Sequence, residues 1–350
     1  MEKKHGALTD KPCTEKKTNY NSIDLFKFIM AIFVVAIHTE PFYYCENELF
    51  KQFFSELTAC AVPFFFMASG YLLARKLNSP YCSEENQRVV ISYLKKIIKM
   101  YLVWTAIYFP LAIYDYHLNG YSVPYCILIT IRKIIFRGQN YNSWMLWYLL
   151  ATIYASVVIL ATMKLKFKSK TKCLPVIALV MIVVCSIINK ISWSEHDLPA
   201  VLELVKKLIM LTITDGSVLS GITPISFGIL AYGNEKFFKP FAWLLIPCFA
   251  VLLISDNELI AQIVGIIKNF AVFGLALNIT LKDRPIYKTL RLSSTIIYLI
   301  HMYINTFVCF ILYKEMKAGP LVFVLTASVS IAVSLLYLFI SNRFKTRKQL

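Results

Sequence analysis

Ten long apolar runs constrain the fold of this chain more than any other feature of its sequence. Each run has about 15 to 22 residues, close to the roughly 20 that a helix needs to cross the hydrocarbon core of a bilayer. The runs cover residues 23–42, 57–73, 97–114, 144–163, 174–188, 218–232, 241–254, 259–281, 292–312 and 321–340. The composition agrees, because 58% of the residues are hydrophobic and only 16% are charged, unlike a soluble domain. The sequence therefore predicts an all-α polytopic membrane protein with about ten transmembrane helices.

The charged residues predict the orientation of these helices. The 37 Lys and Arg residues against 20 Asp and Glu fall in short blocks between apolar runs, which disfavours a nucleic-acid-binding face. Basic connections alternate with acidic or mixed ones, and Lys and Arg accumulate on the cytoplasmic side of a membrane. The basic segments precede residue 21 and cover residues 75–99, 164–172, 235–239, 282–291 and 343–348. We therefore expect both termini in the cytoplasm.

Two further segments are moderately apolar but carry internal basic residues. Residues 123–136 contain Arg132 and Lys133, and residues 201–214 contain Lys206 and Lys207. Either one, taken as a span, would invert every later loop, so we expect both to be interfacial or re-entrant helices on the outer side.

The domain organisation follows from the same runs. We expect a polar cytoplasmic tail at residues 1–22, a transmembrane domain at 23–341 and a basic cytoplasmic tail at 342–350. The nine cysteines lack a CxxC spacing, so neither a metal site nor a disulfide framework is predicted. No internal repeat or matched pair of broken helices suggests an inverted-repeat transporter.

The first apolar run carries two ionisable residues, Lys27 and His38. Eleven helical steps of about 100° bring them to within roughly 20° of one another, about 16 Å apart along the helix. Asp24 and the small Ala31 lie on or near the same stripe. We therefore expect a slender slot along this face, joining the two sides of the membrane.

Each of these residues has a structural alternative to a functional role. Lys27 can lie at the helix end with its ammonium extended to water and paired with Asp24. His38 can be a neutral, hydrogen-bonded packing residue. Its near-neutral pKa also suits a proton acceptor for a hydroxyl nucleophile.

Four motifs in order resemble the membrane-bound acyltransferase family 3, whose members O-acylate extracytoplasmic glycans and lipids. Lys27 and His38 with ten residues between them resemble its Arg-x10-His motif, and Pro63 to Tyr71 resemble its P-x-F-F-x-x-S-G-Y/F segment. Trp147-Tyr148-Leu149 and Tyr298-Leu299-Ile300-His301 resemble its W-Y-L and Y-L-I-H sequences. The family implies ten core helices. Lysine replaces the family's arginine, offering a point charge rather than a planar fork.

The amino-acid sequence of the first two apolar runs is also similar to that of the membrane domains of vancomycin-resistance serine racemases, where the domain is associated with serine uptake. That resemblance gives an alternative function, a transporter for a small amino acid such as serine. The absence of internal repeats and of a racemase domain within the 350 residues weighs against this alternative.

The resemblance implies roles for further polar residues, each with a structural alternative. Ser69 and Gly70 either line a donor channel beside Lys27 or let two helices pack closely. Trp144, Trp147 and Tyr148 either confine substrates beside His38 or form an aromatic belt. The polar stripe Ser294, Tyr298 and His301 should face the bundle interior, with Tyr298 and His301 supporting the donor. Asp215 either orients His38 or caps a helix. Arg75, Arg284 and Arg291 belong to a basic mouth suited to lipid or CoA phosphates.

We therefore expect a multi-pass enzyme of the bacterial cytoplasmic membrane, surrounded by lipid. The resemblance implies an O-acyltransferase with acyl-CoA, most simply acetyl-CoA, as co-substrate and no bound cofactor or metal. His38 and Lys27 are the expected catalytic residues, with Asp24, Ser69, Gly70, Trp147, Tyr148, Tyr298 and His301 binding donor or substrate. The acceptor would be an extracytoplasmic glycan or lipid.

Overall fold

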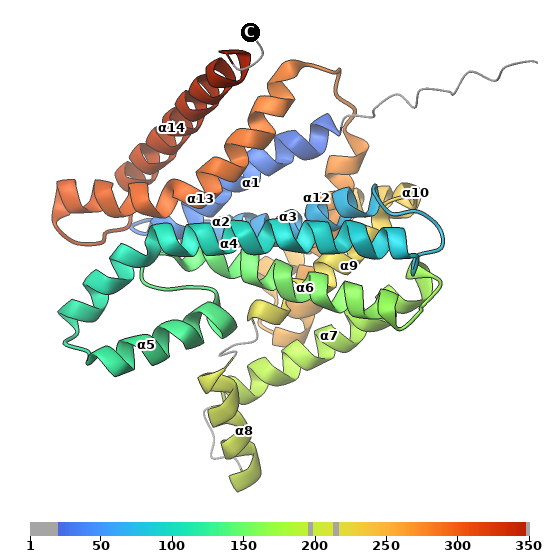
Figure 1. The fold of residues 1–350 in the computed structure, drawn as a ribbon, viewed down its shortest axis with the longest axis horizontal. Helices are drawn as coiled ribbons and strands as arrows, with labels where there is room; N and C mark the ends of the chain where they lie inside the picture. Colours follow the sequence, from blue (N-terminus) through green and yellow to red (C-terminus); the bar gives the residue numbers. More distant parts are fainter. Residues whose placement is uncertain (1–19, 195–198, 213–216, 348–350) are drawn as a thin grey trace, which may run out of the picture.

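The computed structural model describes residues 20–194, 199–212 and 217–347, and every regular element in these ranges is a helix. Nine helices in the described ranges have the length and apolar composition of a membrane span. These are Asn21–Thr39, Glu48–Ala74, Glu84–Leu118, Trp144–Lys164, Lys170–Ser192, Glu235–Ile254, Glu258–Asn278, Pro285–Tyr313 and Pro320–Phe344. The predicted all-α polytopic membrane fold is confirmed (Figure 1).

The individual elements follow the apolar runs closely. The α-helices are α1 (Asn21–Thr39), α2 (Glu48–Thr58), α3 (Ala61–Ala74), α4 (Glu84–Leu118), α5 (Val123–Arg132), α6 (Trp147–Lys164), α7 (Lys170–Ser192), α8 (Ala200–Leu211), α9 (Ile222–Ala231), α10 (Glu235–Phe238), α11 (Leu245–Ile254), α12 (Glu258–Asn278), α13 (Pro285–Tyr313) and α14 (Pro320–Arg347). Short π or 3₁₀ turns are η1 (Lys133–Arg137), η2 (Trp144–Leu146), η3 (Ser217–Leu219) and η4 (Lys239–Leu244). The predicted tail before residue 20 lies outside the described residues.

The tenth predicted span, residues 218–232, is not a full-length helix. It contains η3 and the ten-residue helix α9, which at 1.5 Å per residue is only about 15 Å long. A short helix inside a membrane needs partners for its terminal backbone groups. Lys170 supplies them at one end, because its Nζ donates to the carbonyls of Ile229 at 3.3 Å and Tyr232 at 2.9 Å.

The structure also changes several boundaries. Residues 48–58 form the helix α2 where a loop is expected, and a break at Ala59 and Cys60 separates α2 from α3. α4 extends the third apolar run at both ends to 35 residues. The two doubtful segments become α5 and α8, with 10 and 12 residues. Neither is long enough to span a bilayer.

The loops predicted to be cytoplasmic meet at one end of the bundle, here called the basic end. Asn21 Nδ2 donates to the Lys282 carbonyl at 3.4 Å, and the Tyr81 amide donates to the Lys168 carbonyl at 3.3 Å. Asn278 Nδ2 likewise donates to the carbonyl of Lys239 at 2.7 Å. These contacts connect neighbouring basic segments up to residues 282–291, in agreement with the predicted alternation of loops.

The other end of the bundle, here called the His38 end, gathers the remaining loops. The Gly319 amide donates to the Thr39 carbonyl at 2.9 Å, which places the start of α14 beside the end of α1. The C-terminal end of α9 lies at the basic end, because Lys170, the first residue of α7, donates to the carbonyls of Ile229 and Tyr232 there.

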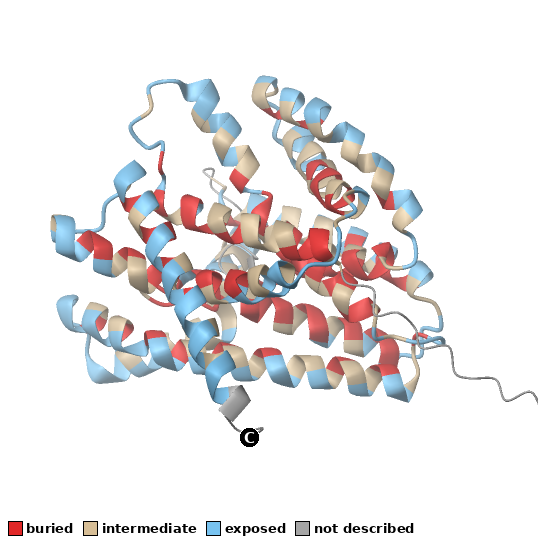
Figure 2. Ribbon diagram, turned by 90° about the horizontal axis from the view of Figure 1, so that it is seen from above, coloured by how far each residue is buried: buried red, intermediate tan, exposed pale blue. Residues whose placement is uncertain are grey.

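The core lies along the middle of the bundle, where α1 packs against α3 and α13, and α3 against α9. Figure 2 shows the buried residues concentrated on these inner helices and the exposed residues on the peripheral ones. α3 and α9 approach unusually closely through two glycines. A Cβ on Gly70 would lie 2.2 Å from the Ile225 carbonyl oxygen, and one on Gly228 would lie 2.1 Å from that of Met67.

Candidate functional site

The ionisable residues of α1 all project toward α13, but they are not paired as expected. Asp24 is buried and forms an ion pair with Arg291 of α13, with Oδ2 and Nη1 3.3 Å apart. Lys27 lies within electrostatic range of Asp24 and Arg291 but forms no hydrogen bond or ion pair with either, so the structural alternative of a direct Lys27–Asp24 pair is not seen. Lys27 is therefore a half-buried cation whose ammonium has no direct hydrogen bond or ion pair among the described residues.

The face between Lys27 and His38 is closed. Ala31 and Val34 lie between them on the same stripe and are 0% and 2% exposed. No space the size of a water molecule lies beside these two side chains, so the predicted open slot is absent. The small side chain of Ala31 allows neighbouring helices to pack directly on this stripe.

His38 lies in a cluster of three rings, here called the three-ring cluster, with Trp144 and His301. The His38 ring stacks on that of His301 with centroids 5.3 Å apart and planes 29° apart. Trp144, at the start of η2, lies 5.9 Å from His38. The end of α1 sets this position, because Glu40 adopts a left-handed conformation with φ 42° and Pro41 stops the helix.

His301 is fully buried, and one of its ring nitrogens is held firmly. Nδ1 lies 2.8 Å from the Tyr298 carbonyl oxygen and 3.2 Å from that of Ile297. Carbonyl oxygens only accept hydrogen bonds, so Nδ1 carries the proton. Nε2 is buried and has no partner among the described atoms. His38, in contrast, forms no hydrogen bond with any described residue.

A second group of rings connects this cluster to α3. The hydroxyls of Tyr148 and Ser69 lie 3.0 Å apart, and Tyr298 Oη donates to the Met145 carbonyl at 2.7 Å. The Tyr148 and Tyr298 rings are 5.5 Å apart, and Tyr298 lies 6.2 Å from His301. Ser69, Tyr148, Tyr298 and His301 thus form one continuous set, and the stripe Ser294, Tyr298 and His301 is buried in the bundle.

Two other predicted site residues point elsewhere. Gly70 faces the backbone of α9, which matches the close-packing alternative. The Trp147 ring lies edge-on to Phe66, 6.0 Å away. Trp144, three residues earlier and 41% exposed, is the tryptophan that contacts His38. Asp215 lies outside the described residues.

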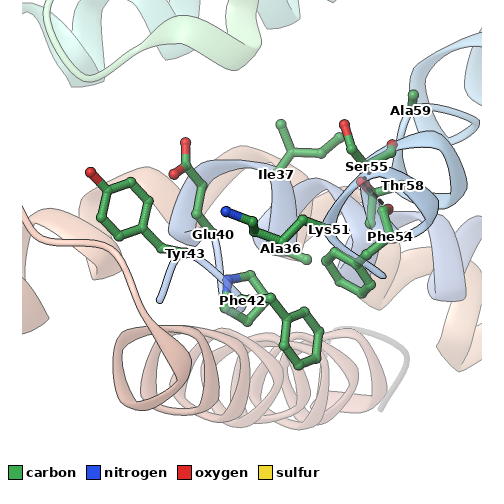
Figure 3. A pocket seen from close by; sticks show the side chains of 11 residues that line it. Ala36, Ile37, Glu40, Phe42, Tyr43, Lys51, Phe54, Ser55, Thr58 and Ala59 are labelled. Carbon is green, nitrogen blue, oxygen red and sulfur yellow. Dashed lines mark hydrogen bonds between the residues drawn. The ribbon is translucent and has the colours of Figure 1, made fainter. Parts of the chain in front are cut away.

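Among the larger cavities of the described residues, two border the central helices, and neither of the two is lined by His38 or Lys27. One of about 750 Å³ lies between the end of α1 and α2 (Figure 3). Its α1 residues Ala36 and Ile37 project from other sides of the helix than His38. The other, about 620 Å³, is an apolar groove bordered by α7 and α12.

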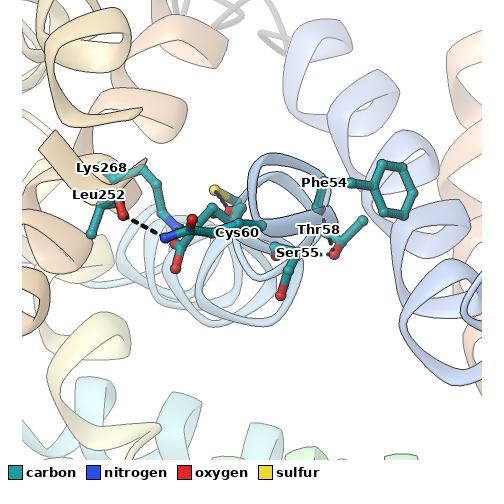
Figure 4. A network of polar contacts seen from close by, with 8 residues as sticks. Phe54, Ser55, Thr58, Cys60, Leu252 and Lys268 are labelled. Atoms are coloured by element: carbon teal, nitrogen blue, oxygen red, sulfur yellow. Dashed lines mark hydrogen bonds and ion pairs between the residues drawn. The ribbon is translucent and has the colours of Figure 1, made fainter. Parts of the chain in front are cut away.

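A buried ion pair inside the membrane was missed by the sequence analysis. Lys268 of α12 is 3% exposed, pairs with the Glu56 carboxylate and donates to the Glu56 carbonyl at 2.8 Å. Figure 4 shows this network at the break between α2 and α3, where Gln52 also donates to the Leu252 carbonyl at 3.0 Å. The signal was available, because Lys268 interrupts an apolar run just as Lys27 does.

The basic end places cations around the start of α1. The Arg75 guanidinium lies 5.4 Å from the Tyr20 ring centroid, and the Arg291 side chain is 45% exposed despite its ion pair. Lys27 lies one turn further into the bundle. This end therefore offers positive charge to a phosphate-bearing ligand.

Partial similarity links the chain to curated racemases. It is 39% identical over 144 residues to an amino-acid racemase of Enterococcus faecalis, covering 41% of this chain and 19% of that protein. It is 35% identical over 137 residues to a serine/alanine racemase of Enterococcus gallinarum, covering 39% and 19%. The matched part is about a fifth of these relatives' length. No solved structure matches the chain.

A family model settles the broader class. A model described as an acyltransferase domain matches residues 20–339, nearly the whole described chain. This match covers α1 with Lys27 and His38, the tyrosine and serine contacts of α3 and α6, and His301 of α13. The chain therefore belongs to the acyltransferase 3 family and is a multi-pass membrane acyltransferase.

Proposed function

We propose that this acyltransferase moves an acyl group, acetyl in the simplest case, from acyl-CoA at the basic end to a hydroxyl at the His38 end. The acceptor is a glycan or another cell-envelope molecule outside the cytoplasmic membrane. The observation that carries the proposal is the three-ring cluster, in which two imidazoles meet below an exposed tryptophan. Imidazole is the side chain best suited to proton transfer at neutral pH.

The proposed acyl-CoA site at the basic end is supported by the positive charges there. CoA carries phosphates, and the unpaired ammonium of Lys27 with the exposed guanidinium of Arg291 gives them partners at the basic end. The acyl arm must then reach His38, about 16 Å along α1. Because Ala31 and Val34 are packed against their neighbours, donor binding has to separate α1 from its neighbours along this stripe.

The amino-acid transporter remains the weaker alternative. Its support is the partial similarity to racemases, which covers 19% of each of the two relatives named above. Uptake of labelled serine by vesicles without added acyl-CoA would distinguish a transporter from an enzyme.

The test compares wild-type protein in lipid nanodiscs with His38→Ala, using radiolabelled acetyl-CoA and isolated cell-envelope glycans and lipids. We expect the wild type to acetylate an envelope component and His38→Ala to lower the rate by about 100-fold or more. His117→Ala, an exposed histidine at the end of α4, is the matched control and should leave the rate unchanged. Full activity of His38→Ala would contradict the proposal.

A further inference from the structure

The two histidines of the three-ring cluster differ in how they are held. His301 donates from Nδ1 to the Tyr298 carbonyl at 2.8 Å, so its tautomer and ring orientation are fixed. His38 has no such bond among the described residues. A general base in an enzyme is commonly oriented by a hydrogen bond to its second nitrogen, leaving the first to take the proton. By this criterion His301 is the better-prepared base.

The second ring nitrogen of His301, Nε2, has no hydrogen-bond partner among the described residues. Nε2 is buried, carries a lone pair because Nδ1 holds the proton, and has no donor among the described atoms. Leaving a buried acceptor unpaired is unfavourable. The neighbouring His38 ring does not supply this donor, because no hydrogen bond reaches Nε2 from any described residue. A ligand hydroxyl would supply the missing donor.

Two neighbouring asparagines indicate that this ligand is the acceptor. Asn305 lies one helical turn beyond His301 toward the His38 end, is 1% exposed, and its Nδ2 has no partner among the described atoms. Asn142 is also 1% exposed, and its Nδ2 donates to Thr306 at 3.0 Å while its Oδ1 stays unpaired. The two amides thus leave one donor and one acceptor unpaired near His301, and a ligand hydroxyl can both accept from the first and donate to the second.

We propose that His301 is a second catalytic residue, whose Nε2 accepts the proton of the acceptor hydroxyl. The inference rests on the proposed function. The acceptor O–H bond breaks as its proton passes to Nε2, and the oxygen attacks the thioester carbonyl carbon. The N–H of His38 stabilises the oxyanion. The C–S bond then breaks, and the CoA thiolate takes the proton from His301, leaving an ester and CoA.

The acceptor reaches His301 through the outer members of the cluster. His301 is 0% exposed, whereas Trp144 is 41% exposed and His38 is half-buried. The acceptor therefore enters past Trp144, whose exposed face offers a stacking surface for the apolar face of a sugar, while His38 stays beside His301.

The decisive variant is His301→Asn. The asparagine amide can replace Nδ1 as donor to the Tyr298 carbonyl, but it places nothing at Nε2. We expect an unchanged thermal unfolding midpoint and an unchanged KM for acetyl-CoA, with kcat for transfer lowered about 10² to 10⁴-fold. The residual rate should rise tenfold per pH unit, as for hydroxide-dependent reaction, whereas the wild-type rate levels off. His38→Ala should lower kcat and keep the level region.

Several outcomes would decide the inference. Wild-type kcat and pH profile in His301→Asn would overturn it while leaving the acyltransferase proposal intact, and a wild type that transfers no acyl group would defeat the proposed function first. His301→Gln covers the case in which the asparagine variant does not fold, because its amide fills the site but is not a base. Full activity of His301→Gln would equally overturn the inference. Asn119→Ala, an exposed asparagine after α4, serves as control.

Discussion

At the residue scale, the two charged stripe residues of α1 have different environments. Asp24 is neutralised by Arg291, so it fixes α1 against α13. Lys27, one turn further along, is half-buried and forms no hydrogen bond or ion pair among the described residues, and the charges near it, Asp24 and Arg291, are already paired with each other. A buried cation without a partner is unfavourable unless a ligand supplies the counter-charge. Lys27 is therefore expected to act in donor binding rather than in stability.

Replacing Lys27 tests this assignment. Lys27→Met should raise the KM for acyl-CoA by roughly 10 to 150-fold, the equivalent of a charged hydrogen bond of about 1.5–3 kcal/mol. Lys27→Arg should retain binding because it keeps the charge. Lys314→Met, at the opposite end of the bundle, is the control. Initial rates at varied acetyl-CoA give the answer, and an unchanged KM in Lys27→Met would remove this residue from the donor site.

At the scale of elements, the short helix α9 depends on its neighbours. α9 is too short to span the bilayer. It is held by Lys170 at one end and by the glycine contacts with α3 along its side. The break between α2 and α3 is held in the same way, by the ion pair of Lys268 with Glu56. Each of these two irregular segments thus has a buried residue of a neighbouring helix as its partner.

The glycine contacts between α3 and α9 predict a loss of stability on adding one methyl group. Gly70→Ala should lower the free energy of unfolding by about 1–3 kcal/mol, because its Cβ would meet the Ile225 carbonyl. Gly265→Ala is the matched control in α12, where nothing lies within 4 Å, and it should be neutral or stabilising by up to about 1 kcal/mol. Denaturant titration in detergent measures both, and equal stabilities would rule out this close contact.

At the scale of the whole molecule, the arrangement of loops predicts which surfaces face outward. Cys45 lies in the loop after α1 at the His38 end, and Cys82 lies before α4 at the basic end. A membrane-impermeant maleimide added to intact cells should label Cys45 and leave Cys82 unlabelled. In a Cys126→Ser background, which removes the partly exposed cysteine of α5, Cys45→Ser should abolish that labelling. The reverse pattern would invert the predicted orientation.

The sequence alone determined the class of fold and the ends of the molecule. Apolar run length identifies membrane helices because backbone groups in lipid must be satisfied within a helix, and the basic loops gathered at one end as predicted. It also placed Lys27 and His38 on one face, since both lie in the same uninterrupted helix, α1.

The tertiary structure decided what that face meets. Helical periodicity does not identify the helix that packs against this face of α1. Only the fold shows that α13 packs there, that Asp24 pairs with Arg291 and that the His301 ring lies against His38. It also shows that Trp144, not Trp147, contacts His38, and that Nε2 of His301 has no hydrogen-bond partner among the described atoms. These facts depend on contacts between residues as far apart as 38 and 301, which no local pattern encodes.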